Sequence, residues 1–341
     1  MTEKIVLVTG CTGFIGRYLI TKLAKQNYRI YAIVRDIKKA KQIFLNNNKV
    51  MEKTTFIQGD LTTQVHILSK EIKEKMISGE IYVINLVGGG PLTANKKLYN
   101  PIYTLNVVTL KNLFKILEET DKIKDVRMFI HLSSLAAMGA LNPNSIYTPQ
   151  TSCHPVLPYE IAKYDSENVV KKFANKYRFK AVILRPPQVY GKDSKEFLNM
   201  INLIKRGIFP LPKGAGSLPL IHVEDLTEII VKILNNEEKM DNLTIMLPCE
   251  KSYPYSEIES IVKEHYSSGG IMYPPYFIMY ILALLLEIIY PNFLKMPEPF
   301  NRYRLKSVLR KRIVKDDKIK DILLYEYKWN LKKFLRSLNH T

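Results

Sequence analysis

The sequence predicts an α/β fold in which a doubly wound parallel sheet carries a smaller C-terminal region. Apolar segments of strand length alternate with amphipathic helical segments over the first 190 residues, as in a parallel sheet covered on both faces. A glycine-rich segment follows the first strand and opens the first helix. The 341 residues, 46% of them hydrophobic, can bury a large core.

The predicted elements follow one another along the chain. Strands are expected at Ile5–Val8, Ile30–Val34, Thr55–Ile57, Ile81–Leu86, Met128–Leu132 and Ala181–Leu184. Helices are expected at Ile15–Gln26, Ile37–Leu45, Val65–Met76, Leu105–Glu118 and Tyr159–Tyr177. Ligands of such sheets bind at the carboxyl ends of the strands. We therefore expect a dinucleotide-binding domain in residues 1–190 and, interleaved with it, a substrate-binding region in residues 191–341.

The first motif is Thr9-Gly10-Cys11-Thr12-Gly13-Phe14-Ile15-Gly16. Its three glycines permit a tight turn, a close approach of the backbone to a pyrophosphate, and close packing of helix on strand. The helix N-terminus that follows attracts an anion. A tight connection without a ligand is the alternative interpretation. The strand before the motif and the helix after it favour a Rossmann-like cofactor site.

The second motif places Tyr159 and Lys163 four residues apart on one face of a predicted helix. A phenol and an ammonium so placed can share a proton-transfer task, because a nearby positive charge favours the phenolate. Tyr18 and Lys22 have the same spacing, so this pattern alone is weak. The order of the two motifs and the strands between them indicate a dinucleotide-dependent redox enzyme.

Together the motifs resemble the extended short-chain dehydrogenase/reductase family, of the NAD-dependent epimerase/dehydratase type. Further segments match in the same order: Gly59-Asp60-Leu61, Asn85-Leu86-Val87-Gly88, Leu132-Ser133-Ser134, Leu184–Gly191 and Ile221–Leu226. The resemblance covers residues 4 to about 235. Beyond that, the chain is loosely similar to members of the 3β-hydroxysteroid dehydrogenase and dihydroflavonol reductase type.

The resemblance implies roles for individual residues. Tyr159 would exchange a proton with the substrate oxygen, Lys163 would lower the pKa of that tyrosine and bind the nicotinamide ribose, and Ser134 would hydrogen-bond the same oxygen. Ser133 is interpreted as an ordinary hydroxyl at the end of a strand. The implied cofactor-binding residues are Gly10, Thr12, Gly13, Phe14, Ile15, Gly16, Arg35, Asp60, Leu61, Leu86, Gly88, Tyr159, Lys163 and Pro186.

The residues at the end of the second predicted strand indicate whether the protein binds NADP or NAD. Arg35 is the first residue after that strand and can pair with the 2′-phosphate of NADP. Asp36 follows, and it is either a ligand of the NAD ribose or the N-cap of the next helix. The sequence therefore favours NADP and leaves NAD as the alternative.

Departures from the family pattern reduce the number of reaction types that the sequence supports. Leu135 and Ala136 follow Ser134 where nucleotide-sugar dehydratases carry Asp-Glu, which disfavours a dehydratase. Gln188 stands where nucleotide-sugar enzymes place an asparagine, and Ser217–Leu220 lacks their arginine for the diphosphate. We expect an oxidoreductase that interconverts a secondary alcohol and a ketone on a lipid-like substrate. A nucleotide-sugar epimerase with tightly held NAD and a non-catalytic scaffold are the alternatives.

Several other residues admit two interpretations. Asn106 either bends its helix or lies on the surface. His222 and Asp225 are more typical of a strand-to-helix junction than of an acid/base pair. Cys153 and His154 precede the tyrosine motif and could supply an epimerase with a second proton donor.

The charge distribution concerns the partners of the protein. The formal net charge is +19, and from residue 295 onward 14 lysines and arginines stand against 5 acidic residues. No nucleic-acid-binding module is present in the sequence, so nucleic acid is not an expected partner.

The segment Tyr276–Tyr290 is apolar except for Glu287 and, at fifteen residues, shorter than the roughly 20 that span a bilayer. It is either a buried helix beside the substrate pocket or an interfacial helix that docks on an anionic membrane together with Arg302, Arg304, Lys306, Arg310, Lys311 and Arg312.

The cysteine content and the N-terminus bear on location. The first predicted strand begins within five residues of Met1, which leaves no room for a secretory signal. The three cysteines form neither a Cys-x-x-Cys pair nor a cluster with histidines, so no metal site is expected. We expect a cytoplasmic protein with a peripheral membrane contact as an option. The resemblance further implies a helix-mediated homodimer.

Overall fold

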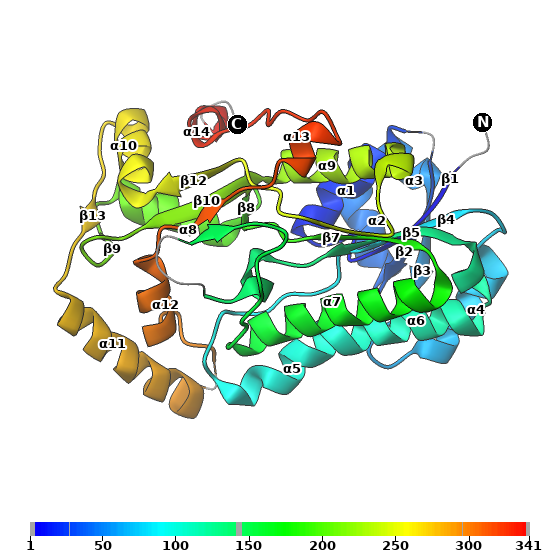
Figure 1. Ribbon diagram of the computed structural model, residues 1–341, viewed down its shortest axis with the longest axis horizontal. Helices are drawn as coiled ribbons and strands as arrows, with labels where there is room; N and C mark the ends of the chain where they lie inside the picture. Colours follow the sequence, from blue (N-terminus) through cyan, green and yellow to red (C-terminus); the bar gives the residue numbers. More distant parts are fainter. Residues whose placement is uncertain (1–3, 27, 141–144, 295, 339–341) are drawn as a thin grey trace.

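The central feature of the fold is a seven-stranded sheet in which all neighbouring strands are parallel (Figure 1). The computed structural model describes residues 4–26, 28–140, 145–294 and 296–338. The strand order is β11-β7-β5-β4-β1-β2-β3. These strands are β1 (Lys4–Thr9), β2 (Tyr28–Val34), β3 (Thr54–Gln58), β4 (Ile81–Asn85), β5 (Val126–Leu132), β7 (Lys180–Leu184) and β11 (Leu243–Met246).

Helices cover both faces of this sheet, as the apolar strands require. One face packs against α1 (Phe14–Ala24), α2 (Ile37–Phe44), α3 (Asn48–Lys53) and α9 (Val223–Asn235). The other face packs against α4 (Val65–Lys75), α6 (Thr109–Glu119) and α7 (Pro158–Tyr177). Figure 1 shows the two helical layers on opposite sides of the sheet. The predicted doubly wound fold is confirmed.

The seventh strand was not predicted. The six expected strands are all present, but β11 returns to the sheet from the C-terminal half and pairs with β7. It is only four residues long, Leu-Thr-Ile-Met, which is too short for a periodic signal. Both β11 and α9, which follow residue 190, pack in or against the large sheet.

The smaller region lies beside the carboxyl ends of the large sheet. A three-stranded sheet of β8 (Gln188–Tyr190), β10 (Ser217–His222) and β12 (Lys251–Pro254) forms its centre. It packs with α8 (Lys195–Lys205), α10 (Tyr255–Tyr266) and α14 (Leu331–Leu338) around a third apolar core. Two further helices, α11 (Tyr276–Ile289) and α12 (Arg302–Val308), lie at one end of the molecule (Figure 1).

A carboxyl group joins the outer strands of the small sheet. Glu250 accepts hydrogen bonds from the hydroxyl of Tyr190 on β8, at 2.6 Å, and from the hydroxyl of Tyr253 on β12. Burial raises the pKa of Glu250 to about 7, and the two tyrosine hydrogen bonds oppose that rise. The fold therefore favours the neutral form of this carboxyl group.

We expect the free energy of unfolding to fall as the pH rises, because Glu250 then ionises. A folded-state pKa above the ordinary value of 4.5 gives a stabilisation that is complete below that pH and is lost as the pH rises through about 7. Glu250→Gln cannot titrate, so the unfolding free energy of the unaltered protein should fall on the order of 2 kcal/mol relative to the variant between pH 4.5 and pH 8. Urea unfolding at both pH values measures this. Glu74→Gln, at an exposed position, is the control, and a difference independent of pH would contradict the assignment.

Candidate active site

The glycine motif forms a tight turn between β1 and α1. Gly10 has a φ of +76°, which a residue with a side chain rarely adopts. A Cβ on Gly16 would lie 2.2 Å from the carbonyl oxygen of Gly10, so only glycine lets the helix approach the turn this closely. The first turn of α1 carries no acidic residue. The N-terminus of α1 is thus shaped and charged for an anionic group.

A cavity of about 280 Å³ opens directly over this turn and brings most of the predicted residues together. The predicted residues that line it are Gly10, Gly13, Phe14, Ile15, Gly16, Leu86, Gly88, Ser134, Tyr159, Lys163 and Pro186. They come from the carboxyl ends of the central strands and from α7. The sheet therefore assembles the site from segments that are far apart in the sequence.

Four predicted cofactor residues do not line this cavity: Thr12, Arg35, Asp60 and Leu61. Leu61 is buried in the core beside α4 and α6, because its side chain turns away from the open edge of the sheet. Asp60 holds its own loop by accepting hydrogen bonds from Thr62. Burial acts to raise the pKa of the Asp60 carboxyl group, but the hydrogen bonds from Thr62 and, after them, the charge of Arg35 lower it. Arg35 itself is exposed after β2.

Asp36 was predicted to be either a ligand of the NAD ribose or a helix N-cap, and its hydrogen bond favours the N-cap. Its carboxylate accepts from the backbone N–H of Lys39 at 3.0 Å and caps the N-terminus of α2. An N-cap carboxylate is held by the helix that it stabilises. Arg35, next to it, keeps an exposed guanidinium at the edge of β2.

Tyr159 stands at the start of α7, and the local sequence explains why the helix begins there. Pro158 occupies the first helical position, and Glu160 accepts hydrogen bonds from the backbone N–H groups of Val156 and Leu157 at 2.9 and 3.1 Å. This capped turn holds the tyrosine at the boundary of two cavities, both of which it lines.

Ser134 and Lys163 both lie near Tyr159, but they make different contacts with it. The hydroxyl of Ser134 accepts from the backbone N–H of Ala136 at 3.1 Å and is hydrogen-bonded to Tyr159. Burial raises the pKa of Tyr159, and this bond to Ser134 opposes the rise. The ammonium of Lys163 lies 6.0 Å from the centre of the tyrosine ring. Burial lowers the pKa of Lys163 to about 8, while the charge of Glu167 opposes that fall.

A chain of buried polar groups fixes Lys163. Its ammonium donates to the carbonyl of Leu132 at 3.0 Å, and its own carbonyl accepts from Ser166 at 2.7 Å. The ring of His131 bonds to Ser166 at 2.9 Å and to Asn85 at 3.1 Å. Burial keeps the pKa of His131 well below its ordinary value, so this ring is neutral. The chain ties α7 to the ends of β4 and β5.

Ser133, interpreted as an ordinary strand-end hydroxyl, has a specific partner. It donates to the buried carboxylate of Glu167 at 2.6 Å, and Arg185 binds the same carboxylate with two hydrogen bonds of 2.8 and 2.6 Å. Of the two adjacent serines, only Ser134 is thus positioned beside Tyr159.

The surface interpretation of Asn106 is wrong. The predicted helix Leu105–Glu118 begins earlier, with α5 (Tyr99–Tyr103), and contains a π-helical turn at Thr104–Val108 before α6. Asn106 lies in that turn, is 1% exposed, and bonds to both the N–H and the carbonyl of Gly89. It bends the helix and fixes the loop after β4.

The other residues with two interpretations have structural contacts. His222 caps α9 and stacks on Trp329 with ring centres 4.1 Å apart. Asp225 accepts hydrogen bonds from the hydroxyl of Tyr325 and from two backbone N–H groups. Cys153 and His154 do not line either cavity that Tyr159 lines. His222 and Asp225 are thus held at a strand-to-helix junction, as expected.

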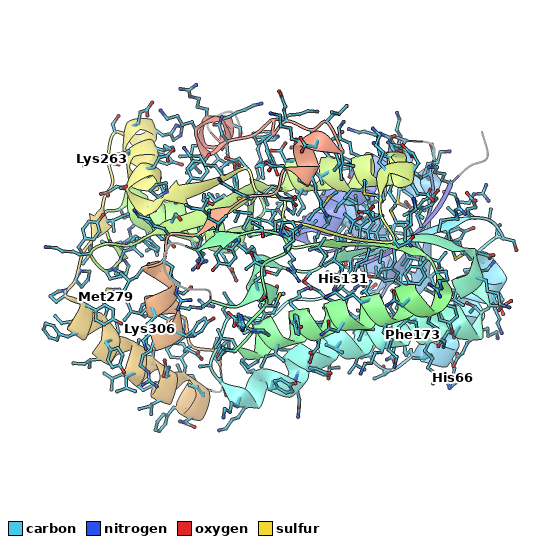
Figure 2. All side chains as sticks on the ribbon, viewed as in Figure 1. His66, His131, Phe173, Lys263, Met279 and Lys306 are labelled. Atoms are coloured by element: carbon cyan, nitrogen blue, oxygen red, sulfur yellow. The ribbon has the colours of Figure 1, made fainter. Side chains whose placement is uncertain are left out.

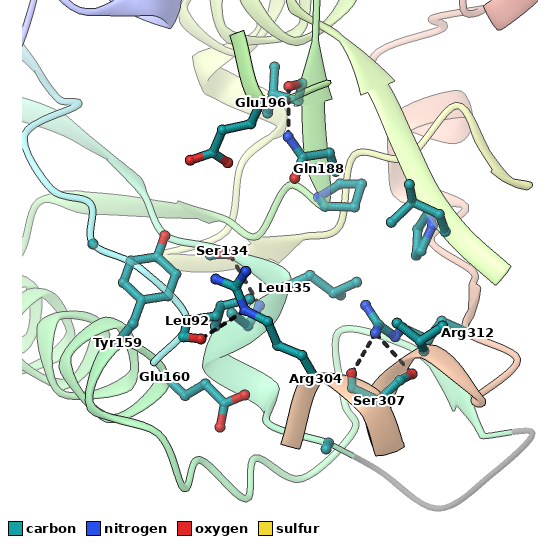
Figure 3. A pocket seen from close by; sticks show the side chains of 18 of the residues that line it. Leu92, Ser134, Leu135, Tyr159, Glu160, Gln188, Glu196, Arg304, Ser307 and Arg312 are labelled. Atoms are coloured by element: carbon teal, nitrogen blue, oxygen red, sulfur yellow. Dashed lines mark hydrogen bonds between the residues drawn. The ribbon is translucent and has the colours of Figure 1, made fainter. Parts of the chain in front are cut away.

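A larger cavity, of about 660 Å³, lies on the other side of Ser134 and Tyr159 (Figure 3). Its walls include apolar side chains such as Phe14, Leu135 and Leu218. Two arginines, Arg304 and Arg312, also line it, and the sequence had placed them in a membrane-facing tail. Arg304 lies on α12 and Arg312 follows that helix, so their place in the cavity depends on how this segment packs against the rest of the fold.

The arginines keep donors for a ligand. Arg304 donates from Nε to the carbonyl of Leu92 at 2.9 Å, and Arg312 bonds to Ser307. A guanidinium has five N–H donors, so these bonds leave others. Three carboxylates line the cavity. Glu160 accepts from the hydroxyl of Tyr303, and Asp193 pairs with Arg17. Burial lowers the pKa of Arg304, and the charge of Glu196 opposes this fall.

The residues around the smaller cavity fit a nicotinamide dinucleotide. The turn and the N-terminus of α1 would hold the pyrophosphate, Lys163 the ribose, and Pro186 the nicotinamide end. Gly88 keeps this path open, because a Cβ there would lie 2.7 Å from the ammonium of Lys163. The fold and this site define a dinucleotide-dependent oxidoreductase.

Comparisons with known proteins identify the family. Residues 6–246 match the NAD-dependent epimerase/dehydratase family, and the chain belongs to it. A proposed UDP-glucose 4-epimerase of Methanocaldococcus jannaschii is 25% identical over 70% of this chain and 76% of its own length. A ketoreductase of Cercospora beticola is 22% identical over 57% of this chain and 58% of its own.

The overall fold has relatives among solved structures. A UDP-glucuronic acid 4-epimerase of Bacillus cereus, solved with NAD, superposes with a TM-score of 0.71 over 97% of this chain and 94% of its own, at 18% identity. The protein therefore belongs to a family of enzymes. A non-catalytic scaffold is no longer an alternative.

Proposed function

We propose that this enzyme interconverts a secondary alcohol and a ketone with a preference for NADP, on a substrate that carries an anionic group and an apolar portion. One observation carries this proposal: Ser134 and Tyr159 lie between a cavity suited to the dinucleotide and a larger cavity suited to the substrate.

The catalytic roles follow from this placement. Bound in the smaller cavity, reduced nicotinamide would supply the hydride for the carbonyl carbon. Tyr159 would donate its phenolic proton to the carbonyl oxygen, while the hydroxyl of Ser134 donates a hydrogen bond to the same oxygen. The positive charge of Lys163 would stabilise the phenolate that remains.

The substrate class follows from the arginines of the larger cavity. The sequence lacks diphosphate-binding groups around Gln188 and Ser217, and this favoured an apolar or lipid-like substrate. Arg304 and Arg312 supply cationic donors from another part of the chain. Guanidinium groups bind phosphate and carboxylate groups well. We therefore propose an anionic group on the substrate, with the apolar walls holding the remainder.

The arginines also support a second function, nucleotide-sugar epimerisation with a tightly held NAD, as the names of several relatives suggest. The two functions differ in the fate of the cofactor. An epimerase oxidises and re-reduces one carbon and keeps its NAD, whereas a reductase exchanges its cofactor at each turnover. Analysis of the dinucleotide that co-purifies with the protein separates them: retained NAD supports the epimerase and freely exchanging NADP the reductase.

Tyr159→Phe tests the catalytic mechanism. The change removes one hydroxyl, so folding and cofactor binding should survive while turnover falls at least about 100-fold. Loss of reduced-cofactor absorbance with a panel of ketones measures turnover, and calorimetry measures cofactor binding. Tyr177, on the same helix as Tyr159, donates its hydroxyl to Glu118 on α6, and Tyr177→Phe should leave turnover unchanged. Full activity in the Tyr159 variant would refute the mechanism.

Arg35→Ala tests cofactor preference. It should weaken NADP binding by roughly 1.5–3 kcal/mol, the range for a charge-assisted contact, and leave NAD binding nearly unchanged. Calorimetric titration of each cofactor measures both affinities. Lys38→Ala, which removes another exposed cation nearby, is the control. Equal losses for the two cofactors would show that Arg35 does not read the 2′-phosphate.

The substrate subsite is tested by removing either of its arginines. With NADP saturating the smaller cavity, inorganic pyrophosphate serves as a probe of the larger one. Arg304→Ala and Arg312→Ala should each weaken pyrophosphate binding by roughly tenfold or more. Lys311→Ala, at an exposed position between α12 and Arg312, should have little effect. Unchanged binding in both arginine variants would remove the anionic group from the proposed substrate.

A further inference from the structure

Helix α11 exposes a large apolar surface at one end of the molecule. Its helical path continues through a π-helical turn to Leu294, giving nineteen residues with a mean hydropathy of 2.0, of which 11% are buried. The fifteen-residue estimate was therefore too short, and this helix is long and apolar enough to cross a membrane by length and composition. More than half of the exposed large hydrophobic side chains in the described part of the chain lie between Met272 and Met296.

The exposed side chains surround most of the helix. Phe277 is 64% exposed and Phe293 is 77% exposed. The other exposed residues between them are Ile278, Ile281, Leu282, Leu284, Leu285, Ile288 and Ile289. Only a narrow stripe with Met279 and Ala283 is buried, on the side that contacts α12. Figure 2 shows the side chains of α11 projecting away from the rest of the protein. The interpretation of this segment as a buried helix is wrong.

The single charge of the helix is neutralised on its inner side. Glu287 binds the guanidinium of Arg302 through hydrogen bonds and a 2.8 Å ion pair, and accepts from the backbone N–H of the same residue. This contact fastens α11 to α12. The outward surface of the helix is left without a charged side chain, which suits burial among lipid acyl chains better than exposure to water.

Both ends of α11 are fastened to the folded protein, so the helix lies along the surface. Before it, β13 (Ile271–Met272) pairs with β9 (Phe209–Pro210). After it, the carboxylate of Glu298 accepts from Thr93 at 2.6 Å and from the backbone N–H of Ala94 at 3.0 Å. A helix that crossed a bilayer would place these two attachments on opposite sides of the membrane. The geometry therefore allows a helix in the interface and opposes a spanning one.

Cations and aromatic side chains flank the apolar surface. Lys96 and Lys97 are exposed beside the C-terminal end of α11, where Lys97 donates to Asn292 at 3.4 Å. Tyr273 and Tyr276 are exposed at the N-terminal end. Tyrosine favours the boundary between lipid tails and water, and lysine beside it favours anionic headgroups.

We propose that α11 is a docking helix for an anionic lipid bilayer. Its apolar surface enters the interface among the acyl chains, while Lys96 and Lys97 contact the headgroups. The expected cationic tail does not take this role as a whole: Arg304 and Arg312 line the larger cavity and Arg302 holds Glu287, whereas Lys306 and Lys311 remain exposed. Lys295 lies outside the described residues.

Docking would connect the membrane with the substrate cavity. Helix α12 contacts α11 and also supplies Tyr303, Arg304 and Ser307 to the walls of the larger cavity. A bilayer held by α11 is therefore one helix away from the groups proposed to bind an anionic substrate. Docking itself rests on the surface of α11 alone and does not depend on the proposed reaction.

Vesicle co-sedimentation of the full-length protein tests the proposal. We expect binding to phosphatidylcholine vesicles that contain phosphatidylglycerol, weaker binding to phosphatidylcholine alone, and weakening by salt. Ile281→Glu with Leu285→Glu places two charges on the exposed surface and should reduce vesicle binding by roughly tenfold or more. Lys96→Glu with Lys97→Glu should reduce binding to anionic vesicles by roughly tenfold and leave binding to neutral ones unchanged.

Matched controls separate docking from folding and from self-association. Leu45→Glu with Ile67→Glu changes exposed apolar residues elsewhere and should leave vesicle binding unchanged. Dinucleotide affinity should be the same in all variants, which separates this proposal from the proposed reaction. If the protein stays in the supernatant with anionic vesicles at low salt, the proposal is overturned. If light scattering instead shows a dimer that the Ile281 and Leu285 changes dissociate without any vesicle binding, a second copy covers this surface and the proposal is equally overturned.

Discussion

The buried ion pair between Glu167 and Arg185 is the interaction on which the site depends. Glu167 lies one turn after Lys163 on α7, and Arg185 follows β7, while Ser133 at the end of β5 completes the contact at 2.6 Å. Both charged side chains are almost fully buried, so removal of either partner leaves an uncompensated charge that costs about 3–5 kcal/mol. This contact fixes the position of α7 relative to the sheet, and with it the positions of Tyr159 and Lys163.

A second set of polar contacts acts at the same level of the sheet. Thr9, Asn85 and His131 lie side by side on β1, β4 and β5, because those strands are paired in parallel at these residues. Their hydrogen bonds continue to Ser166 and reach the carbonyl of Lys163. Satisfied buried networks of this kind hold one arrangement and oppose others. The smaller cavity, Tyr159 and Lys163 consequently lie together at the carboxyl ends of the central strands.

The larger cavity, on the other side of Ser134 and Tyr159, is built differently. Its walls come from the small sheet, from α12 and from the loops beside them. Most of its lining residues lie within the matched residues 6–246, and those beyond this range are Tyr255, Tyr303, Arg304, Ser307, Val308 and Arg312. The exposed apolar helix α11 is fastened to the same α12 that supplies Arg304. The two cavities share Phe14, Ser134, Tyr159, Pro187 and Val189, whereas Arg304 and Arg312 come from beyond the part of the chain that matches the family.

The sequence by itself determined the parallel sheet, the glycine turn and the Tyr159–Lys163 pair, because each depends on spacing within one strand, turn or helix. It also distinguished Ser134 from Ser133. The tertiary structure alone decided that Asn106 is buried in a π-helical turn, that β11 completes the sheet, and that Arg304 and Arg312 line the larger cavity. It also decided that α11 is exposed rather than buried. These features depend on contacts between residues far apart in the chain, and hydrophobic periodicity records which residues are apolar but not which neighbour covers them.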